Sequence, residues 1–216
     1  MKTVAVIDYG MGNLHSVAKA LEHVATDTKV VVSGDPQTIL AADRVVLPGV
    51  GAIRDCMGEL QRLGMDEVVR EVVQNKPLLG VCVGMQALLE FSAENGGVAC
   101  LGLLPGRLDF FGDAFTRNPP AQPLKVPHMG WNQVHQNDPS HPMWQGIKQD
   151  SAFYFVHSYF LPGSQAAEVC AATTEYSQRF CSAVSRGNIF ATQFHPEKSA
   201  EAGLRLYRNF LAWNGN

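Results

Sequence analysis

The first half of the chain alternates between apolar runs and amphipathic stretches. Near-continuous apolar or β-branched runs predict four buried strands, at residues 3–8, 28–33, 43–49 and 76–82. Helical periodicity separates them, most clearly at Leu14, Val17, Leu21 and Val24. Further helices are predicted over residues 52–74 and 85–94, and Asp35 is placed to cap a short one. Strands that alternate with helices and are apolar on both faces indicate a parallel sheet covered on two sides.

The second half has a different pattern, in which Gly- and Pro-rich connections separate the apolar runs. Strands are predicted at residues 101–111, 124–134, 152–161, 166–173, 181–185 and 189–194. "SRGN" (185–188) is typical of a hairpin turn, and a last helix is predicted over 201–213. The predicted fold class is therefore α/β, an open, mostly parallel twisted sheet flanked by helices, with antiparallel strands in the C-terminal half. We expect residues 1–216 to form a single domain.

Composition narrows the classes of function. The chain has 216 residues, of which 46% are hydrophobic, enough for one sizeable core. Seventeen basic and twenty acidic residues give a net charge of −3 without a basic stripe, which argues against nucleic-acid binding. No apolar run reaches the ~18 residues that span a bilayer, and the opening "MKTVAVIDYG" reads as a strand rather than a signal peptide. We expect a cytoplasmic protein with no membrane association.

The five cysteines are widely spaced and contain no C-x-x-C pair. This argues against a disulfide framework and against a zinc site, so no metal or other cofactor is expected. Most of these cysteines are interpreted as small buried hydrophobes. Cys82 is the exception.

Cys82 lies in "GVCVG", after a predicted strand and before a predicted helix. This G-x-C-x-G pattern matches the G-x-S-x-G nucleophile elbow, in which a sharp turn lifts the nucleophile above the sheet's carboxyl edge. Gly80 and Gly84 would remove Cβ atoms where the backbone turns tightly. The helix N-terminus would favour the thiolate, and the N–H of Val83 would point toward an oxyanion. A buried small residue at a strand–helix junction is the alternative.

"QFHPEKS" (193–199) provides a base for such a thiol. Pro196 favours an extended conformation at His195, and residues two apart in an extended chain project to the same side. His195 and Glu197 are therefore predicted neighbours, with Glu197 orienting the imidazole as the third member of a triad. A surface turn after a strand is the alternative for this motif.

"LPGVG" (47–51) also ends a predicted strand. The glycines on either side of Val50 make an exposed backbone able to donate N–H groups, and a second oxyanion donor commonly comes from such a loop. An ordinary strand-to-helix turn is the alternative.

Together, P-G-V-G, G-V-C-V-G-M-Q and H-P-E-K-S resemble the motifs of the class I (triad) glutamine amidotransferases, whose fold is flavodoxin-like. The resemblance implies that Cys82 attacks the side-chain amide of L-glutamine and forms a thioester, with His195 as base and Glu197 as its orienter. It also implies oxyanion donors at Val83 and at Gly49, Val50 and Gly51. Gln86 and Glu94 would hold the substrate glutamine, and Glu94 would contact the α-amino group of that glutamine. The alternative is that both are polar residues on a helix surface.

"IDYGMGNLHSV" (7–17), "VPHMGWNQV" (126–134) and "FYFVHSYF" (153–160) extend the resemblance to the glutaminase subunits of imidazole glycerol phosphate synthases. That family implies a role in histidine biosynthesis and a heterodimer with a (β/α)₈-barrel cyclase. The cyclase would receive the ammonia and form imidazole glycerol phosphate and an aminoimidazole carboxamide ribotide.

The same stretches supply further candidate residues. The resemblance puts Asn13 and Trp131 at the partner interface and Tyr154 and Lys198 near the ammonia exit. It puts backbone of His157, Ser158 and Tyr159 at the border of the glutamine pocket. The simpler alternatives are a helix cap for Asn13, a core or strand aromatic for Trp131, and ordinary strand or solvated residues for the others. "GMGN" lacks the third glycine of a dinucleotide-binding motif, which argues against a dinucleotide.

Three other functions stay open at this stage. They are an amidotransferase subunit that supplies ammonia to another synthase, a catalytically silent subunit that only binds a partner, and a free-standing cysteine hydrolase. The segment 112–123 has no functional account, and His128 is interpreted as structural rather than catalytic.

Overall fold

The structure, a computed structural model, describes residues 1–215. These residues form a mixed β-sheet flanked by helices. Its parallel part has the strand order β2-β1-β3-β4-β13. The strands are β1 (Lys2–Ile7), β2 (Thr28–Ser33), β3 (Arg44–Gly49), β4 (Leu78–Cys82) and β13 (Ile189–Thr192). Every residue of β3, β4 and β13 is buried, as the continuous apolar runs predict for the centre of a parallel sheet. The predicted fold class is confirmed.

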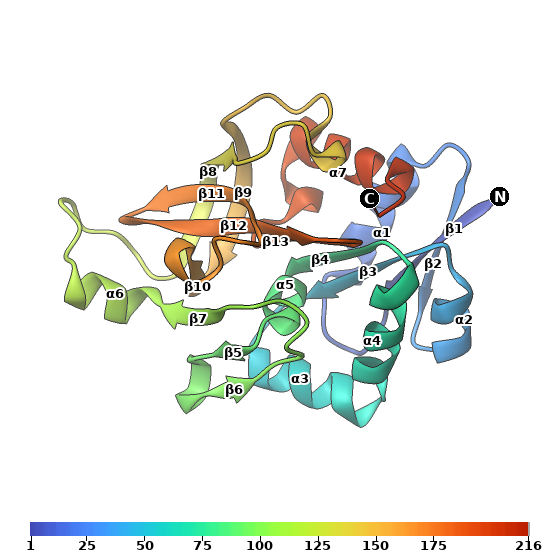
Figure 1. The fold of residues 1–216 in the computed structure, drawn as a ribbon, viewed down its shortest axis with the longest axis horizontal. Helices are drawn as coiled ribbons and strands as arrows, with labels where there is room; N and C mark the ends of the chain where they lie inside the picture. Colours follow the sequence, from blue (N-terminus) through green and yellow to red (C-terminus); the bar gives the residue numbers. More distant parts are fainter. Residues whose placement is uncertain (216) are drawn as a thin grey trace.

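Helices cover this parallel part on both faces (Figure 1). They are α1 (Leu14–Val24), α2 (Pro36–Ala41), α3 (Ile53–Arg62), α4 (Met65–Asn75), α5 (Val83–Leu88) and α7 (Ala200–Ala212). α1 packs against α7 on one side, and α4 and α5 pack against α3 on the other. Asp35 caps α2 as expected, because its side chain accepts from the N–H of Thr38. Within residues 1–215, none of the helices is long and apolar enough to cross a membrane.

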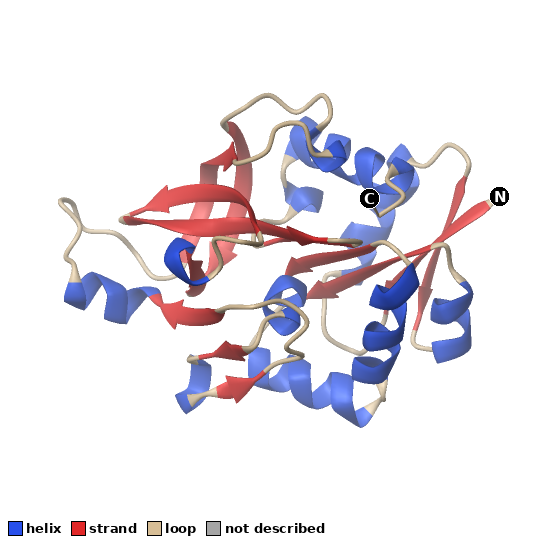
Figure 2. Ribbon diagram, in the orientation of Figure 1, coloured by secondary structure: helices blue, strands red, loops and turns tan. Residues whose placement is uncertain are grey.

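Strands that pair mostly in antiparallel fashion extend the sheet away from the parallel part (Figure 2). They are β5 (Phe91–Ser92), β6 (Val98–Ala99), β7 (Arg107–Phe110), β8 (His128–Gln136), β9 (Ser151–His157), β10 (Tyr159–Pro162), β11 (Cys170–Tyr176) and β12 (Gln178–Arg186). β12 pairs with β13 through the two-residue turn 187–188, which confirms the predicted hairpin. β12 also pairs with β10 and β11, and β11 leads on to β8 and β9. The described residues also contain four short 3₁₀ turns: η1 (Glu94–Gly96), η2 (Pro142–Trp144), η3 (Gly163–Gln165) and η4 (Pro196–Lys198).

Several predicted boundaries are wrong. The helix predicted over 85–94 ends at Leu88, because Phe91 and Ser92 pair with β7, so tertiary pairing overrides helical periodicity. The strand predicted over 101–111 begins only at Arg107, and the one predicted over 152–161 breaks at Ser158.

The segment 112–123 includes most of a short helix, α6 (Phe111–Arg117). Phe111, its first residue, is fully buried and stacks on Phe160 with ring centroids 4.3 Å apart. The same ring meets His157 edge-on at 5.3 Å. α6 is thus anchored to the wall of the site described below.

The prediction for the cysteines is wrong for one pair. Cys170 and Cys181 form a disulfide between the neighbouring strands β11 and β12, which bring their Cα atoms to 5.6 Å. Sequence spacing did not reveal this pair, because it depends on how β11 lies beside β12. In the ladder Cys170 is paired with Val184 and Cys181 with Thr173, and the register shifts between residues 170 and 173. Cys56, Cys82 and Cys100 are free, and the first two of them are buried.

Candidate active site

Cys82 is the last residue of β4 and lies at the carboxyl edge of the parallel sheet. Gly49 of β3 is its register partner on one side. Its backbone has φ 55° and ψ −110°, a conformation that a non-glycine residue rarely adopts and that often marks a functional turn. Helix α5 begins at the next residue. The strand–turn–helix geometry predicted for a nucleophile elbow is therefore present.

The glycines around this turn are required by close packing. A Cβ on Gly84 would lie 1.9 Å from the carbonyl oxygen of Leu47, and one on Gly49 would lie 2.7 Å from the amide nitrogen of Gly84. A Cβ on Gly80 would meet the side chains of Ala191 and Leu88 at 2.9 Å. The start of α5 thus rests directly on the backbone of β3, which fixes where Cys82 points.

His195 and Glu197 are neighbours, as predicted. The His195 Nδ1–H donates to Glu197 Oε1 at 2.8 Å, and both side chains are only 1% exposed. The physical reason differs in part from the expected one. His195 is extended, but Glu197 is brought back to it by the 3₁₀ turn η4 rather than by a continuing extended chain.

The second ring nitrogen of His195, Nε2, faces Cys82. This nitrogen is buried and, within residues 1–215, forms no hydrogen bond of standard geometry. The Cys82 thiol nevertheless lies close enough to influence its protonation. Burial alone would lower the pKa of His195. A negative charge on Cys82, and hydrogen bonding to Cys82 and Glu197, outweigh burial and raise that pKa to about 10. The arrangement therefore favours a protonated imidazole beside Cys82.

Two side chains that sequence reasoning missed hold this pair. The hydroxyl of Ser199 donates to the carbonyl of His195 at 2.6 Å and accepts from the N–H of Tyr154 at 2.9 Å. The hydroxyl of Tyr207, on α7, donates to Glu197 Oε2 at 3.4 Å. Ser199 belongs to the "HPEKS" motif, so its position was a usable signal. For Tyr207, the only signal in the sequence was its position on the apolar face of a predicted helix.

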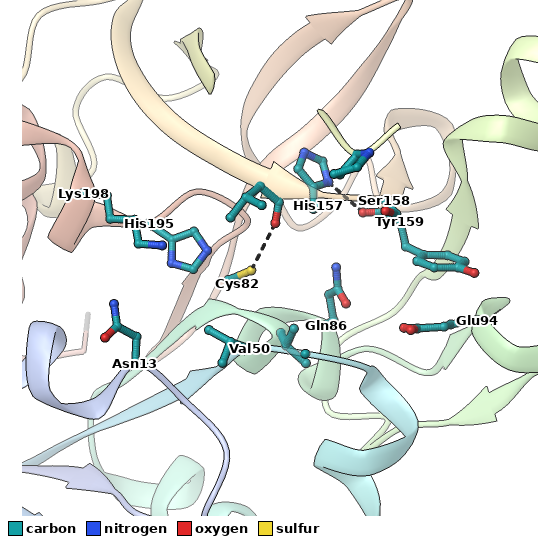
Figure 3. Close-up of a pocket in the computed structure, with 14 residues that line it drawn as sticks. Asn13, Val50, Cys82, Gln86, Glu94, His157, Ser158, Tyr159, His195 and Lys198 are labelled. Atoms are coloured by element: carbon teal, nitrogen blue, oxygen red, sulfur yellow. Dashed lines mark hydrogen bonds between the residues drawn. The ribbon is translucent and has the colours of Figure 1, made fainter. Parts of the chain in front are cut away.

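A cavity of about 540 Å³ opens beside Cys82 (Figure 3). His195 and Lys198 lie on one side of the thiol, and Gln86, Tyr159 and Glu94 lie on the other. The lining residues are Asn13, Val50, Gly51, Cys82, Val83, Gln86, Glu94, Pro127, Val156, His157, Ser158, Tyr159, His195 and Lys198. All except Pro127 and Val156 are candidates named from the sequence. The carbonyl of Val156 lies 4.0 Å from the Cys82 sulfur.

The "PGVG" loop borders the cavity through Val50 and Gly51, whereas Gly49 lies behind them at the end of β3. Its carbonyl groups are held from outside the cavity. Tyr9 donates to the carbonyl of Pro48 at 2.8 Å, and Cys56 donates to that of Val50 at 3.4 Å. Burial raises the pKa of the Cys56 thiol to about 11, so it remains a neutral donor. Sequence reasoning predicted neither contact.

The candidate glutamine-binding residues approach from two sides. Gln86 is buried on α5, and Glu94 lies in η1 rather than on a helix surface. Glu94 Oε2 accepts from the N–H of Ile53 at 3.1 Å. The opposite wall is the break between β9 and β10, where Ser158 lies between His157 and Tyr159.

His157 is fixed by a buried chain of hydrogen bonds that includes His128. Its Nδ1–H donates to the carbonyl of Tyr159 at 2.7 Å, so its Nε2 accepts from His128 Nδ1 at 2.9 Å. His128 Nε2 in turn accepts from Asn132 at 3.2 Å. Burial lowers the pKa of His128 to about 4; burial, with the charges of His128 and His195, lowers that of His157 to about 3. Both rings are thus neutral, with fixed tautomers, and the structural interpretation of His128 is supported.

The remaining candidates lie at the mouth of the site. Asn13 precedes α1 but its side chain makes no capping hydrogen bond, so the cap interpretation is wrong; it lines the cavity instead. Trp131 pairs with Tyr154 across β8 and β9 and is 55% exposed, so it is a strand aromatic but not a core one. Lys198 Nζ lies 5.9 Å from the centre of the Tyr154 ring. Lys198, Tyr154 and Trp131 thus form a series of neighbouring side chains that leads from the cavity to an exposed aromatic ring.

The strand–turn–helix cysteine, its buried histidine–glutamate pair and the α/β sheet define a triad-type amidotransferase. The whole-chain comparison agrees, since residues 5–213 match the family model described as "Glutamine amidotransferase class-I". The chain belongs to that family.

Curated relatives define the particular branch. The chain is 58% identical over 213 residues to "Imidazole glycerol phosphate synthase subunit HisH" of Methylococcus capsulatus, covering 99% of this chain and 97% of the relative. It is 58% identical to the protein of the same name from Acinetobacter baylyi, covering 99% and 100%. It is 57% identical to "subunit HisH 1" of Pseudomonas aeruginosa, covering 100% and 99%. Within the class-I amidotransferases, this chain is a member of the HisH branch.

Solved structures support the fold. A PurLQS structure from Thermotoga maritima matches with a TM-score of 0.71 at 17% identity, covering 98% of each chain. The glutaminase domain of CTPS from Trypanosoma brucei matches with a TM-score of 0.67 at 17% identity, covering 98% of this chain and 93% of the other. At these identities the likeness concerns the fold alone.

Proposed function

We propose that this chain is a glutaminase whose residues 1–216 act as one amidotransferase domain, the glutaminase subunit of an imidazole glycerol phosphate synthase. It hydrolyses L-glutamine to glutamate and ammonia, and the ammonia serves histidine biosynthesis. The observation that carries the proposal is the Cys82–His195–Glu197 arrangement. Glu197 Oε1 accepts a hydrogen bond from His195 Nδ1 at 2.8 Å, and the other ring nitrogen of His195 faces the thiol of Cys82. A protein that only binds a partner has no use for a strained cysteine beside a buried imidazole.

The first half of the reaction is acylation. The Cys82 sulfur, having given its proton to His195, attacks the carboxamide carbon of glutamine. The C–S bond forms, and the C–N bond then breaks as the His195 imidazolium gives its proton to the departing ammonia. Backbone N–H groups of Val83 and of the 49–51 loop stabilise the oxyanion. Glu197 stabilises the imidazolium and keeps its free nitrogen directed at the sulfur.

The second half is hydrolysis of the glutamyl thioester. His195 takes a proton from water, the resulting hydroxide attacks the thioester carbon, and the C–S bond breaks with its electron pair returning to sulfur. Glutamate then leaves the cavity. Gln86, Glu94 and the backbone at 157–159 position the substrate. The Glu94 carboxylate supplies the negative charge that a glutamine α-amino group requires.

The partner would be a (β/α)₈-barrel cyclase that binds over the mouth of the cavity. The exposed side chains of Met129 and Trp131 on β8, 61% and 55% exposed, support an interface there, because large exposed apolar residues mark contact surfaces. Asn13 and Lys198 line the cavity, and Tyr154 contacts both Lys198 and Trp131, so these residues would border the path of the ammonia. We place the complex in the cytoplasm, where this pathway operates.

The test is co-purification with the cyclase, followed by glutaminase assays with and without the ligand of the cyclase. We expect the isolated chain to hydrolyse glutamine slowly and the ligand-loaded complex to hydrolyse it much faster, because the two glycines of the "PGVG" loop leave its oxyanion donor free to be misaligned. A purified single chain with full activity would instead indicate a free-standing hydrolase. A complex without glutaminase activity would refute the proposed function.

A further inference from the structure

Gln193 is a fully buried polar residue that directly follows strand β13. Thr192 is the register partner of Val81 in the parallel pair β13–β4, so the next residue of β13 comes beside Cys82. The backbone N–H of Gln193 donates to the carbonyl of Ser182 at 2.9 Å, which ties the residue to β12 as well. Strand pairing thus fixes an amide side chain next to the reactive thiol.

The direction of this amide is set by a second glutamine. Gln86 Nε2 donates to Gln193 Oε1 at 3.0 Å, in a buried contact. With its oxygen occupied in this way, Gln193 presents Nε2 to the Cys82 sulfur at 3.8 Å. A reversed amide would place a carbonyl oxygen beside the sulfur and two N–H groups of the glutamines against each other. If both amides were reversed, Gln193 Nε2 would donate to Gln86 and the Gln193 oxygen would face the sulfur. The Cys82 thiol, however, donates to the carbonyl of Val156 at 4.0 Å, which leaves its sulfur as an acceptor for Gln193 Nε2 and favours the orientation described.

We propose that Gln193 is a catalytic residue, which donates a hydrogen bond to the Cys82 sulfur and favours its thiolate, while Gln86 positions that donor. The inference rests on the proposed function, because it requires Cys82 to be the nucleophile. A hydrogen bond to the charged form of a group stabilises that form, and the thiolate is the nucleophilic species. In a buried site the effect exceeds that of the same contact in water.

The donor acts at two points of the reaction. Before acylation it stabilises the negative charge on sulfur after the proton has moved to His195. During deacylation it stabilises the sulfur again, as the C–S bond breaks and the electron pair returns to it. In the thioester between these steps, sulfur is a poor acceptor, so the contact is stronger for the thiolate than for the acylated enzyme.

The test measures the reactivity of Cys82 itself, in the complex with the cyclase. Iodoacetamide labelling of the peptide that carries Cys82 is followed by mass spectrometry across pH, and Cys82→Ala confirms the assignment. Gln193→Glu keeps the shape but places a carboxylate beside the sulfur, and Gln193→Met removes the donor. We expect the pH midpoint of labelling to rise by about one unit or more in Gln193→Glu and by less in Gln193→Met, because a like charge opposes the thiolate more than the loss of one donor does.

Gln86→Glu provides the same test with Gln193 intact. A carboxylate at position 86 accepts from Gln193 Nε2 and turns its oxygen toward the sulfur, so the midpoint should rise again. This variant serves if Gln193→Glu does not fold. Gln136→Glu is the matched control: this buried glutamine donates to the carbonyls of Ile147 and Lys148, and its change should leave the midpoint in place.

The outcomes separate the two claims. A midpoint unchanged in Gln193→Met, with Cys82 still labelled, would overturn the role of Gln193 and leave the proposed function intact, because the Glu variants add a charge that shifts the midpoint by itself. A shift as large in Gln136→Glu would also overturn it, since it would reflect general loosening. Glutaminase activity that survives Cys82→Ala would instead refute the proposed function. In every folded variant, ammonia-dependent synthesis by the complex should be unchanged.

Discussion

Glu197 accepts a 2.8 Å hydrogen bond from His195 while Tyr207 contacts its other oxygen, so the C-terminal helix holds the imidazole that faces Cys82. Cys82 ends β4, His195 immediately precedes η4, Glu197 lies within η4, and Tyr207 lies on α7. The thiol is at the rim of the sheet, and the base and its support are brought to it by the far end of the chain.

Removing the base should cost more activity than removing its orienter. His195→Ala should lower the glutaminase kcat of the complex by about 10³-fold or more, because it removes both the base and the acid. Glu197→Gln should lower it less, since the imidazole stays in place with its tautomer less well fixed. Tyr207→Phe should have the smallest effect. Steady-state glutamate release measures all three, and a Glu197→Gln loss equal to that of His195→Ala would contradict this order.

The raised pKa of His195 predicts a loss of stability at high pH. Its value in the folded chain is about 10, against 6.5 for an ordinary histidine, so the folded state holds the proton more tightly. This contribution is complete below pH 6.5 and should be lost as pH rises toward 10, at up to about 1.4 kcal/mol per pH unit. Urea unfolding of the wild type and of His195→Gln at several pH values measures it. A stability difference that does not fall between pH 6.5 and 10 would be inconsistent with a charged His195.

The buried pair His128 and His157 predicts the opposite trend at low pH. Their pKa values are lowered to about 4 and 3, so below pH 6.5 the unfolded chain takes up protons that the folded chain excludes. The stability of the wild type relative to His128→Gln should therefore fall as pH drops from 6.5 to 4. His23→Gln, at an exposed position, is the control. If the wild type and His128→Gln differ by the same free energy at both pH values, His128 is not held neutral.

The glycine that lets α5 rest on β3 should not tolerate a side chain. Gly84→Ala places a Cβ 1.9 Å from the Leu47 carbonyl, so backbone must move, and we expect a destabilisation of about 3 kcal/mol or more. Gly58→Ala is the matched control, because this exposed glycine lies inside α3 and a Cβ there meets nothing within 4 Å. It should stabilise the chain by about 0.5–1 kcal/mol. Thermal or urea unfolding compares them; equal effects would show that the turn at Cys82 is not tightly packed.

Much of the fold and the triad could be predicted because their signals are local. Apolar runs of strand length revealed β1, β2, β3 and β4, and the motifs at Cys82 and His195 each end a buried strand. The short strand β5 could not be predicted, because pairing with β7 overrides the helical periodicity of residues 85–94.

The contacts that sequence reasoning missed depend on strand register. Gln193 meets Cys82 across 111 positions because β13 pairs with β4, and Cys170 meets Cys181 because β11 pairs with β12. No spacing rule contains either pairing. The chain from Asn132 through His128 to His157 likewise needs the β8–β9 pairing, in which His128 faces His157.

The most direct measurement is the synthesis rate of the complex that carries Cys82→Ala, with glutamine and with ammonia as alternative nitrogen sources. We predict that glutamine-dependent synthesis falls to background while ammonia-dependent synthesis keeps the wild-type rate, because the cyclase chemistry needs no thiol from this chain. Cys82→Ser should behave in the same way. Loss of both activities would mean that Cys82 supports the structure rather than the reaction, and retention of glutamine-dependent synthesis would mean that another group is the nucleophile.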